Sequence, residues 1–173
     1  AAITTTVLEK MSTAQIQSMN TSAVALLSTT QIGKLTNAQV GAFSAEQIKA
    51  LTNNQVVALT TSQAHSLSGE QVSAMTTRQI AMLESADFAQ LSTDAIGALS
   101  TAQVRAMTNA QVGALTTDQI GQLGASEVGA LTSTQITSLK RDALAAMGAE
   151  QVQAIKPTVV AAMTTSQISG LTN

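Results

Sequence analysis

His65 is the only histidine in the 173-residue chain, and the chain contains no cysteine. A zinc site in a protein uses three or four His, Cys or carboxylate ligands. His65 has no second histidine and no thiol with which to share a metal ion, so we expect its side chain to face solvent. We expect no metal ion and no other cofactor, and the lack of cysteine excludes disulfide bonds.

Acidic residues recur at one position of a short repeat, where we expect the second residue of a helix. A negative charge there is stabilised by the helix dipole, which is a structural role rather than acid or base catalysis. No Asp-x-Asp-x-Asp calcium loop occurs, and the glycines never form the Gly-x-Gly-x-x-Gly pattern that binds phosphates. We therefore do not expect an enzyme or a catalytic residue. The acidic residues at this position include Glu46, Glu70, Asp94, Asp118, Asp142 and Glu150.

An apolar residue occupies every eighth position from Met11 to Leu171 without a gap. We label the eight positions a to h, with a as this apolar column, so that residues 35–42 make up one unit. A fixed short period is typical of proteins in which identical units stack on one another. Each column has its own composition, and each composition indicates a structural role.

Columns a and f are apolar, and columns b and e are polar. Column a holds 13 Leu and 6 Met among its 21 members, and column f holds 8 Ile and 9 Val among 20. Column b is Ser, Thr or Asn in 16 of 21 units, and column e is Gln in 14 of 20. Most units therefore contain the spacing Ser/Thr-x-x-Gln.

This spacing is the capping box that begins a helix. The hydroxyl at b accepts from the amide three residues later, while the Gln side chain reaches back to the amide of b. Columns a and f then lie where a hydrophobic staple packs across the helix start. Pro157 supports this assignment, because it falls on column c, the first helical position, where the missing N–H costs nothing.

Other secondary structures do not fit the pattern. In one long helix, eight residues advance by about 80° beyond two turns, so columns a and f would spiral around the whole surface. In a strand, the odd spacings between f and a would place them on opposite faces. We therefore predict an all-α fold, a solenoid of very short helices with one helix per eight-residue repeat, columns a and f buried, and columns c and d exposed. Residues 1–173 form this single solenoid, and residues 139–163 are its least regular units.

Column f also suggests how many helices form one coil of the solenoid. It alternates Ile and Val from Ile16 to Val56, which is a period of sixteen residues. This period predicts two helices per coil. With layers about 8–10 Å apart, about ten coils would give a rod roughly 90 Å long.

Charge and composition exclude several partners. The net charge is −2, the 8 Lys and Arg residues are scattered, and there is no Trp or Tyr. A nucleic-acid interface requires a basic patch or aromatic platforms, so we expect no nucleic acid. No apolar run approaches the ~18 residues of a transmembrane helix, so we expect no membrane insertion. The chain begins Ala1-Ala2 without an initiator methionine, as a mature exported chain or an excised fragment would.

The tandem units Leu-Thr-Thr-x-Gln-Ile/Val-x-Ala, as in residues 115–121, resemble a known class of repeats. Such short repeats occur in long, low-complexity exported proteins of Gram-negative bacteria that are often described as adhesin-like. The resemblance covers nearly the whole chain and implies a location outside the cell or at its surface. Together with the solenoid, it leads to the hypothesis of a structural protein: an extracellular rod, stalk or subunit of a self-assembling filament.

Two further hypotheses remain open. A protein- or surface-binding solenoid module could act in adhesion, but such a surface needs aromatic or charged anchors, of which the chain has few. Ice binding through rows of threonine is the other, although the capping box already explains column b. For a lateral contact with a partner we single out Lys140, Arg141 and Lys156, because basic residues replace hydroxyls there. Drift of the repeat explains the same substitutions.

The two ends of the solenoid are the expected sites of self-association. Soluble solenoids need terminal units with a polar outer face, whereas here both ends keep the apolar columns. A contact between unlike ends does not close on itself and propagates as a fibre. The residues expected at these ends are Ile3, Leu8, Met163, Ile168 and Leu171.

Overall fold

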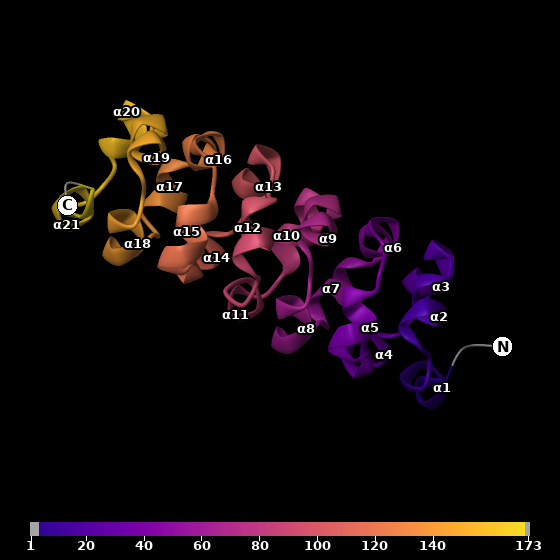
Figure 1. Cartoon of the computed structure of the whole chain (residues 1–173). Helices are drawn as coiled ribbons and strands as arrows, with labels where there is room; N and C mark the ends of the chain where they lie inside the picture. Colours follow the sequence, from indigo (N-terminus) through magenta and orange to yellow (C-terminus); the bar gives the residue numbers. More distant parts are fainter. Residues whose placement is uncertain (1–3, 172–173) are drawn as a thin grey trace.

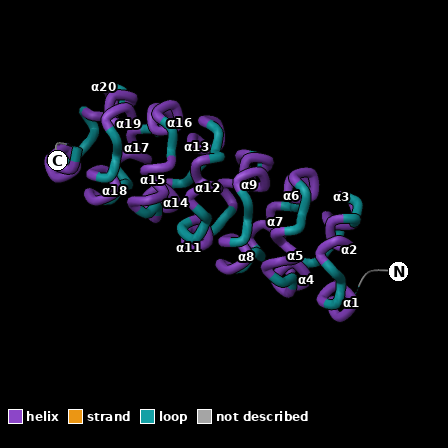
Figure 2. Tube along the Cα trace, viewed as in Figure 1, coloured by secondary structure: helices purple, strands orange, loops and turns teal. Residues whose placement is uncertain are grey.

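The computed structural model describes residues 4–171, and this part of the chain consists of short α-helices joined by brief extended links, without a β-strand (Figures 1 and 2). Each helix has four to six residues and lies within one eight-residue unit. The all-α solenoid with one helix per repeat is therefore confirmed. The helices are α1 Thr5–Glu9, α2 Thr13–Gln17, α3 Thr21–Ala25, α4 Thr29–Lys34, α5 Asn37–Gly41, α6 Ala45–Ala50, α7 Asn53–Val57, α8 Thr61–His65, α9 Gly69–Ala74, α10 Thr77–Met82, α11 Ser85–Phe88, α12 Thr93–Gly97, α13 Thr101–Ala106, α14 Asn109–Ala114, α15 Thr117–Gln122, α16 Ala125–Ala130, α17 Ser133–Ile136, α18 Arg141–Ala145, α19 Ala149–Ala154, α20 Pro157–Val160 and α21 Thr165–Gly170.

Every helix begins where the capping box predicts. Column b is the N-cap, with extended backbone angles such as φ −71° and ψ 159° at Thr52. Where column b is Ser, Thr or Asn, its side-chain oxygen accepts from the amide of column e, and where column e is Gln, its Oε1 accepts from the amide of column b, as between Thr52 and Gln55. Pro157 is the first residue of α20, in agreement with the expectation for column c.

The links between helices are short because two extended residues are enough to turn the chain. In the link after α4, Leu35 on column a has φ −59° and ψ 143°, and Thr36 on column b has φ −71° and ψ 158°. No residue between 4 and 171 has a positive φ. The turn therefore needs no glycine, and any residue type can occupy these positions without backbone strain.

Three helices, rather than two, form each coil. Every prominent contact between helices joins elements that are three apart in the chain, such as α1 with α4, α9 with α12 and α18 with α21. The prediction of two helices per coil is therefore wrong. The helices form three parallel stacks, which begin with α1, α2 and α3, and we number the coils 1 (α1–α3) to 7 (α19–α21). Seven layers about 8–10 Å apart give a rod of about 65 Å, which is shorter than ten coils would give.

The alternation of Ile and Val has a different cause from the one predicted. Neighbours within a stack are three repeats apart, and because three is an odd number, an Ile/Val alternation along the chain also alternates along each stack. The third stack shows this as Val24, Ile48, Val72 and Ile96. A larger side chain thus lies next to a smaller one in successive layers, which suits close packing.

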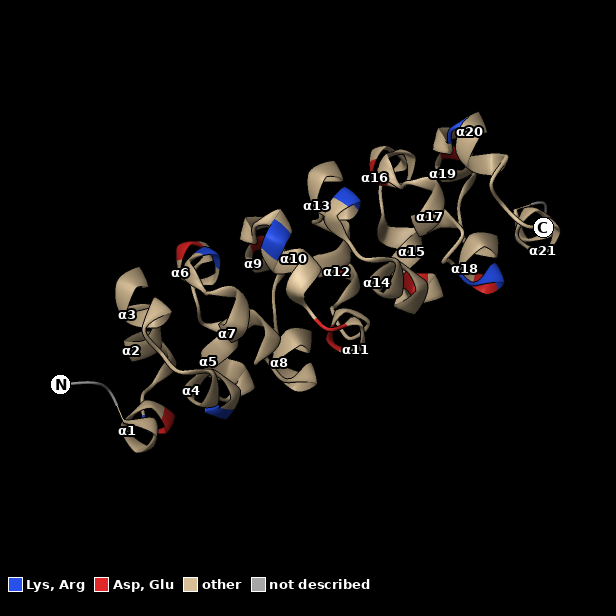
Figure 3. Cartoon of the chain, turned by 180° about the vertical axis from the view of Figure 1, so that it is seen from behind, with Lys and Arg blue, Asp and Glu red and all other residues tan. Residues whose placement is uncertain are grey.

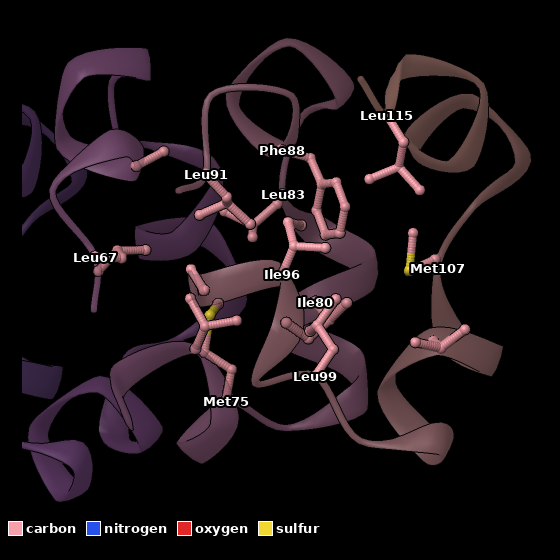
Figure 4. Packing of buried hydrophobic residues seen from close by; sticks show 14 of the residues in the cluster. Leu67, Met75, Ile80, Leu83, Phe88, Leu91, Ile96, Leu99, Met107 and Leu115 are labelled. Atoms are coloured by element: carbon pink, nitrogen blue, oxygen red, sulfur yellow. The ribbon is translucent and has the colours of Figure 1, made fainter. Parts of the chain in front are cut away.

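Ala64 and Phe88 are the extreme case of this size alternation. They occupy column f of α8 and α11, which contact each other, and both are fully buried. Figure 4 shows the Phe88 ring among neighbouring aliphatic side chains, including Ile96. The small residue in one layer offsets the large ring in the next.

The core consists of columns a and f, as predicted. The column f side chains of α1 to α18 are at most 1% exposed. Column d is exposed in every described unit, and column c is exposed or half-buried. Departures occur only in the end coils, where Met11 and Met19 are half-buried on column a and Ile168 on column f is 41% exposed.

Residues 139–163 continue the same three-sided coil in spite of their irregular sequence. The N-caps of helices α18, α19 and α20 are Lys140, Gly148 and Lys156, none of which provides a side-chain cap. Their column a and f residues still pack into the core. The core pattern therefore maintains the fold here without the hydroxyl caps.

Candidate functional site

Buried glutamines form the most regular polar feature of the described chain. In Gln55, Oε1 lies 2.7 Å from the amide of Thr52 and closes the capping box. Its Nε2 donates to the carbonyl oxygens of Val24 in α3 and Leu27 in the link between α3 and α4, at 2.9 and 2.7 Å. One amide group therefore satisfies the start of its own helix and the end of the helix four places earlier in the chain.

The same contacts recur along the rod, and we call this set of column e glutamines the glutamine ladder. Each Nε2 reaches carbonyl oxygens 28 and 31 residues earlier, or one of these together with the carbonyl 30 residues earlier. These side chains are at most 7% exposed. The ladder residues with inter-coil bonds are Gln39, Gln47, Gln55, Gln63, Gln71, Gln79, Gln103, Gln111, Gln119, Gln135, Gln151 and Gln167.

The sequence pattern predicts the cap made by these glutamines but not their bond to an earlier helix. A signal was present, because a capping box accepts Glu as readily as Gln, yet only Glu127 is a glutamate on column e. A carboxylate accepts hydrogen bonds and cannot donate them, whereas an amide does both. The near-exclusive use of Gln therefore indicates a second, donor function.

The ladder is interrupted at five interior positions. Two of the three column e glutamines are missing in coil 4, two in coil 6 and one in coil 7. Buried alanine or valine fills three of these positions, and Glu127 is half-buried. The interrupting residues are Asp87, Ala95, Glu127, Ala143 and Val159.

Asp87 and His65 make their own contacts beside this first interruption. Asp87 is 5% exposed, and its Oδ1 accepts a hydrogen bond of 2.7 Å from the hydroxyl of Thr61. His65 is exposed, as expected, and its Nδ1 lies 2.8 Å from the carbonyl oxygen of Gln90. Both contacts join α8 to α11 or its link, so these residues tie neighbouring coils together.

The acidic residues of column d lie in the first turn of their helices, as predicted, and the three-sided coil also aligns them. Five of them recur at every third repeat and occupy the same position on successive helices of the third stack. We call this row the acidic row. Figures 1 and 2 show its stack winding from one edge of the rod, at α6, to the other, at α18. The row consists of Glu46, Glu70, Asp94, Asp118 and Asp142.

The residues expected at the two ends have different surroundings. Ile3 lies outside the described residues. Leu8 is fully buried and presents no surface to a partner, and Met163 is only 8% exposed. Ile168 is 41% exposed and Leu171 is half-buried in the last coil.

The three basic residues expected at a lateral contact do not form one patch. Lys140 and Arg141 are neighbours at the start of α18, whereas Lys156 is the N-cap of α20. All three are exposed. Figure 3 places α18 and α20 at opposite edges of the rod. The structure therefore brings two of the predicted residues together and separates the third.

No group of three or more His, Asp or Glu residues between residues 4 and 171 could hold a metal ion. An open hollow beside His65 is lined by uncharged residues, including Asn37, Thr61 and Gln90. No helix among these residues has the length and hydropathy to cross a membrane.

The geometry defines the class of the protein: a tandem-repeat α-solenoid held together by an aliphatic core and an amide ladder. The family model of the ALTTAQ repeat matches residues 1–37, 34–61 and 80–117, which is more than half of the chain. The chain belongs to the ALTTAQ repeat family, and the tandem repeat predicted from the sequence is confirmed. No curated protein matches the chain in sequence.

Proposed function

We propose that the chain is a non-enzymatic structural protein, a rod or stalk that also self-associates into filaments. The observation that supports this proposal is the role of the repeated columns. Column b caps each helix, columns a and f form the core, and column e joins successive coils. The recurring columns a, b, e and f thus all serve to build and lengthen one regular rod.

The setting is part of the same proposal. The units resemble those of exported adhesin-like proteins, and this resemblance supports a place outside a bacterial cell, as a spacer or surface filament. A uniform solenoid also fits a spacer because its length is the number of coils multiplied by one constant rise.

Adhesion through a binding face is the weaker alternative. Val57 and Met82 are the exposed large apolar side chains found away from the end coils in the described part. They lie on columns g and h of the neighbouring helices α7 and α10, so they form one small aliphatic pair. Binding hot spots are instead clusters rich in aromatic or arginine anchors. For ice binding, the row of column c residues in the first stack changes from Thr29 to Asn53 and later to Ala125, so it is not a continuous threonine row.

Solution scattering and electron microscopy test the proposal. We expect an elongated particle at low concentration and longer assemblies as the concentration rises, seen by light scattering and negative stain. The double variant Ile168→Glu and Leu171→Glu should keep the rod and lose the assemblies. A compact particle would refute the rod, and a native chain that stays monomeric at high concentration would refute the filament.

A further inference from the structure

The two sides of a coil are different, and the difference gives the rod a direction. Column e donates to the preceding coil, as in the bonds from Gln39 to the carbonyl oxygens of Leu8 and Met11. Column f is covered by the following coil, because Val24 is fully buried in coil 1 whereas Ile168 is 41% exposed in coil 7. Within the described chain, coil 1 therefore presents an uncovered e side and coil 7 an uncovered f side. These two coils lie at opposite ends of the rod (Figure 1).

Apolar exposure is concentrated on these two sides. Five large apolar side chains are markedly exposed among residues 4–171, and three of them belong to the end coils. Val7 is 54% exposed and Leu26 is 84% exposed in coil 1, and Ile168 is 41% exposed in coil 7. Covering these side chains would remove apolar area from water, which favours association.

The uncovered e side of coil 1 carries residue types that are buried on column e in later coils. Column e of coil 1 holds Val7, Gln15 and Ala23. In the interior, Val159 is 5% exposed, Ala95 is fully buried and the ladder glutamines are at most 7% exposed. Gln15 already uses Oε1 to accept from the amide of Ser12, at 2.8 Å. Its Nε2 has no hydrogen-bond acceptor among the residues that the structure describes.

The uncovered f side matches in the same way. Val152 and Val160 are half-buried and Ile168 is exposed, whereas the same residue types on column f are buried in coils 1 to 6. Inside the rod, this kind of surface is covered in every case by the e side of the next coil. The rod contains six junctions between coils, and in each of them the f side of one coil packs against the e side of the next. The e side of coil 1 is therefore the kind of surface that fits the f side of coil 7.

We propose that coil 1 of a second copy of this chain docks on coil 7 in the register that continues the three stacks. This inference rests on the proposed self-association and specifies its geometry. The described helices make seven whole coils, so α1 of the second copy lies on α19 and α2 on α20. Gln15 of the second copy then donates Nε2 to the carbonyl oxygens of Val152 and Ile155, by the spacing rule of the ladder. The contact joins unlike faces and propagates along the rod.

The interior of the rod supplies a distance with which to test this register. Column g of one coil lies against column h of the next coil. A Cβ placed on Gly97 lies 3.7 Å from the Cβ of Gln122, which is within the range that a disulfide spans. The equivalent pair across the proposed interface is Ala161 of one copy and Ser18 of the other. The native chain has no cysteine that would compete.

The experiment mixes two singly substituted chains, Ser18→Cys and Ala161→Cys, under mild oxidation at a concentration at which the native chain associates. We expect a covalent heterodimer as the main product. The matched control replaces Ala161→Cys by Gln153→Cys, which lies one helix out of register, and should give at least tenfold less heterodimer. The double variant Gly97→Cys and Gln122→Cys should form an internal disulfide and shows that the oxidation works.

A second variant tests the proposed hydrogen bonds. Gln15→Glu keeps the acceptor for the amide of Ser12 and loses the donor, so the unfolding midpoint should stay unchanged while association weakens at least tenfold. Assemblies that form with equal cross-linking in both registers would overturn the register and leave the filament intact. A chain that never associates would overturn both the filament and this interface.

Discussion

The junction between coils 2 and 3 and the junction between coils 5 and 6 have the same core and different ladders. In the first, all three column e residues of coil 3 are glutamines that donate to carbonyl groups of earlier helices: Gln55, Gln63 and Gln71. In the second, only Gln135 does so, between Glu127 and Ala143. Columns a and f are buried in both junctions.

This difference separates two tasks that the repeat usually combines. The apolar columns bury surface and provide the main driving force for stacking. The ladder instead satisfies carbonyl groups at the ends of helices and makes one alignment of neighbouring coils better than others. A junction with one ladder glutamine still stacks through its apolar columns. We expect it to be less stable than a junction with three ladder glutamines.

The largest effect is expected from Gln63→Glu in the complete junction. The new carboxylate would lie against the carbonyl oxygens of Ile32 and Leu35, which the amide now contacts at 2.9 and 2.7 Å. A buried charge without a donor should cost about 3 kcal/mol or more, measured by urea denaturation. Gln17→Glu, on the exposed column g, is the control and should be nearly neutral. Equal losses for both variants would mean that the ladder contributes no specific stability.

The incomplete junction should gain stability from the opposite change. Glu127→Gln supplies an amide donor for the carbonyls of Ile96 and Leu99, which lie on the columns whose carbonyl oxygens accept hydrogen bonds from the other ladder glutamines. Combined with Gly124→Ser, it rebuilds the capping box at α16, whose N-cap provides no side-chain bond. We expect a gain of about 1–2 kcal/mol in the free energy of unfolding. A loss of stability would show that the register of this junction differs from that of the others.

The cap can be tested apart from the ladder within one helix. Thr116→Ala removes the hydroxyl that accepts from the amide of Gln119 and should cost about 0.5–2 kcal/mol. Thr117→Ala, at the exposed first helical position, should be nearly neutral in the same chemical denaturation. Similar losses at both positions would contradict the assignment of column b as the N-cap.

The smallest effect concerns the acidic row, which crosses both junctions. Asp118 has Asp94 and Asp142 one coil away on either side, whereas Glu150 occupies the same helix position on α19, in a stack whose other helices have no acidic residue at that position. Like charges about 9 Å apart repel by about 0.5 kcal/mol per pair at low salt, and the repulsion is largely screened at high salt. Asp118→Asn should therefore cost less than Glu150→Gln in a low-salt buffer, with the difference vanishing in high salt. A difference that does not depend on salt would exclude repulsion along the row.

Local structure was predictable from the sequence because its causes are local. The hydroxyl at b, the glutamine at e and the apolar residues at a and f specify where a helix begins and which face it buries. The number of helices in a coil depends instead on how helices three repeats apart pack, and signals that recur in every repeat contain no information about that closure. The period of column f was observed correctly, and it reports alternation between layers rather than two helices per coil.

Only the capping bond of each ladder glutamine was predictable from the sequence, again because only that bond is local. The capping box accounts for one end of each glutamine, and nothing in the local pattern shows where the other end of the amide points. The scarcity of Glu on column e was the available signal. The sequence shows the positions of the acidic residues, but their alignment on one stack of helices follows only from the three-sided coil.

The three-sided coil also determines how such a chain can change its length. Inserting or deleting three repeats adds or removes one whole coil and leaves every later helix in its stack. Inserting a single eight-residue repeat preserves the core and the ladder, because all three sides use the same columns, but it shifts every later helix by one side. The acidic row would then continue on a neighbouring side of the rod. Repeat number can therefore vary freely where only length matters, and in multiples of three where a surface row must stay aligned.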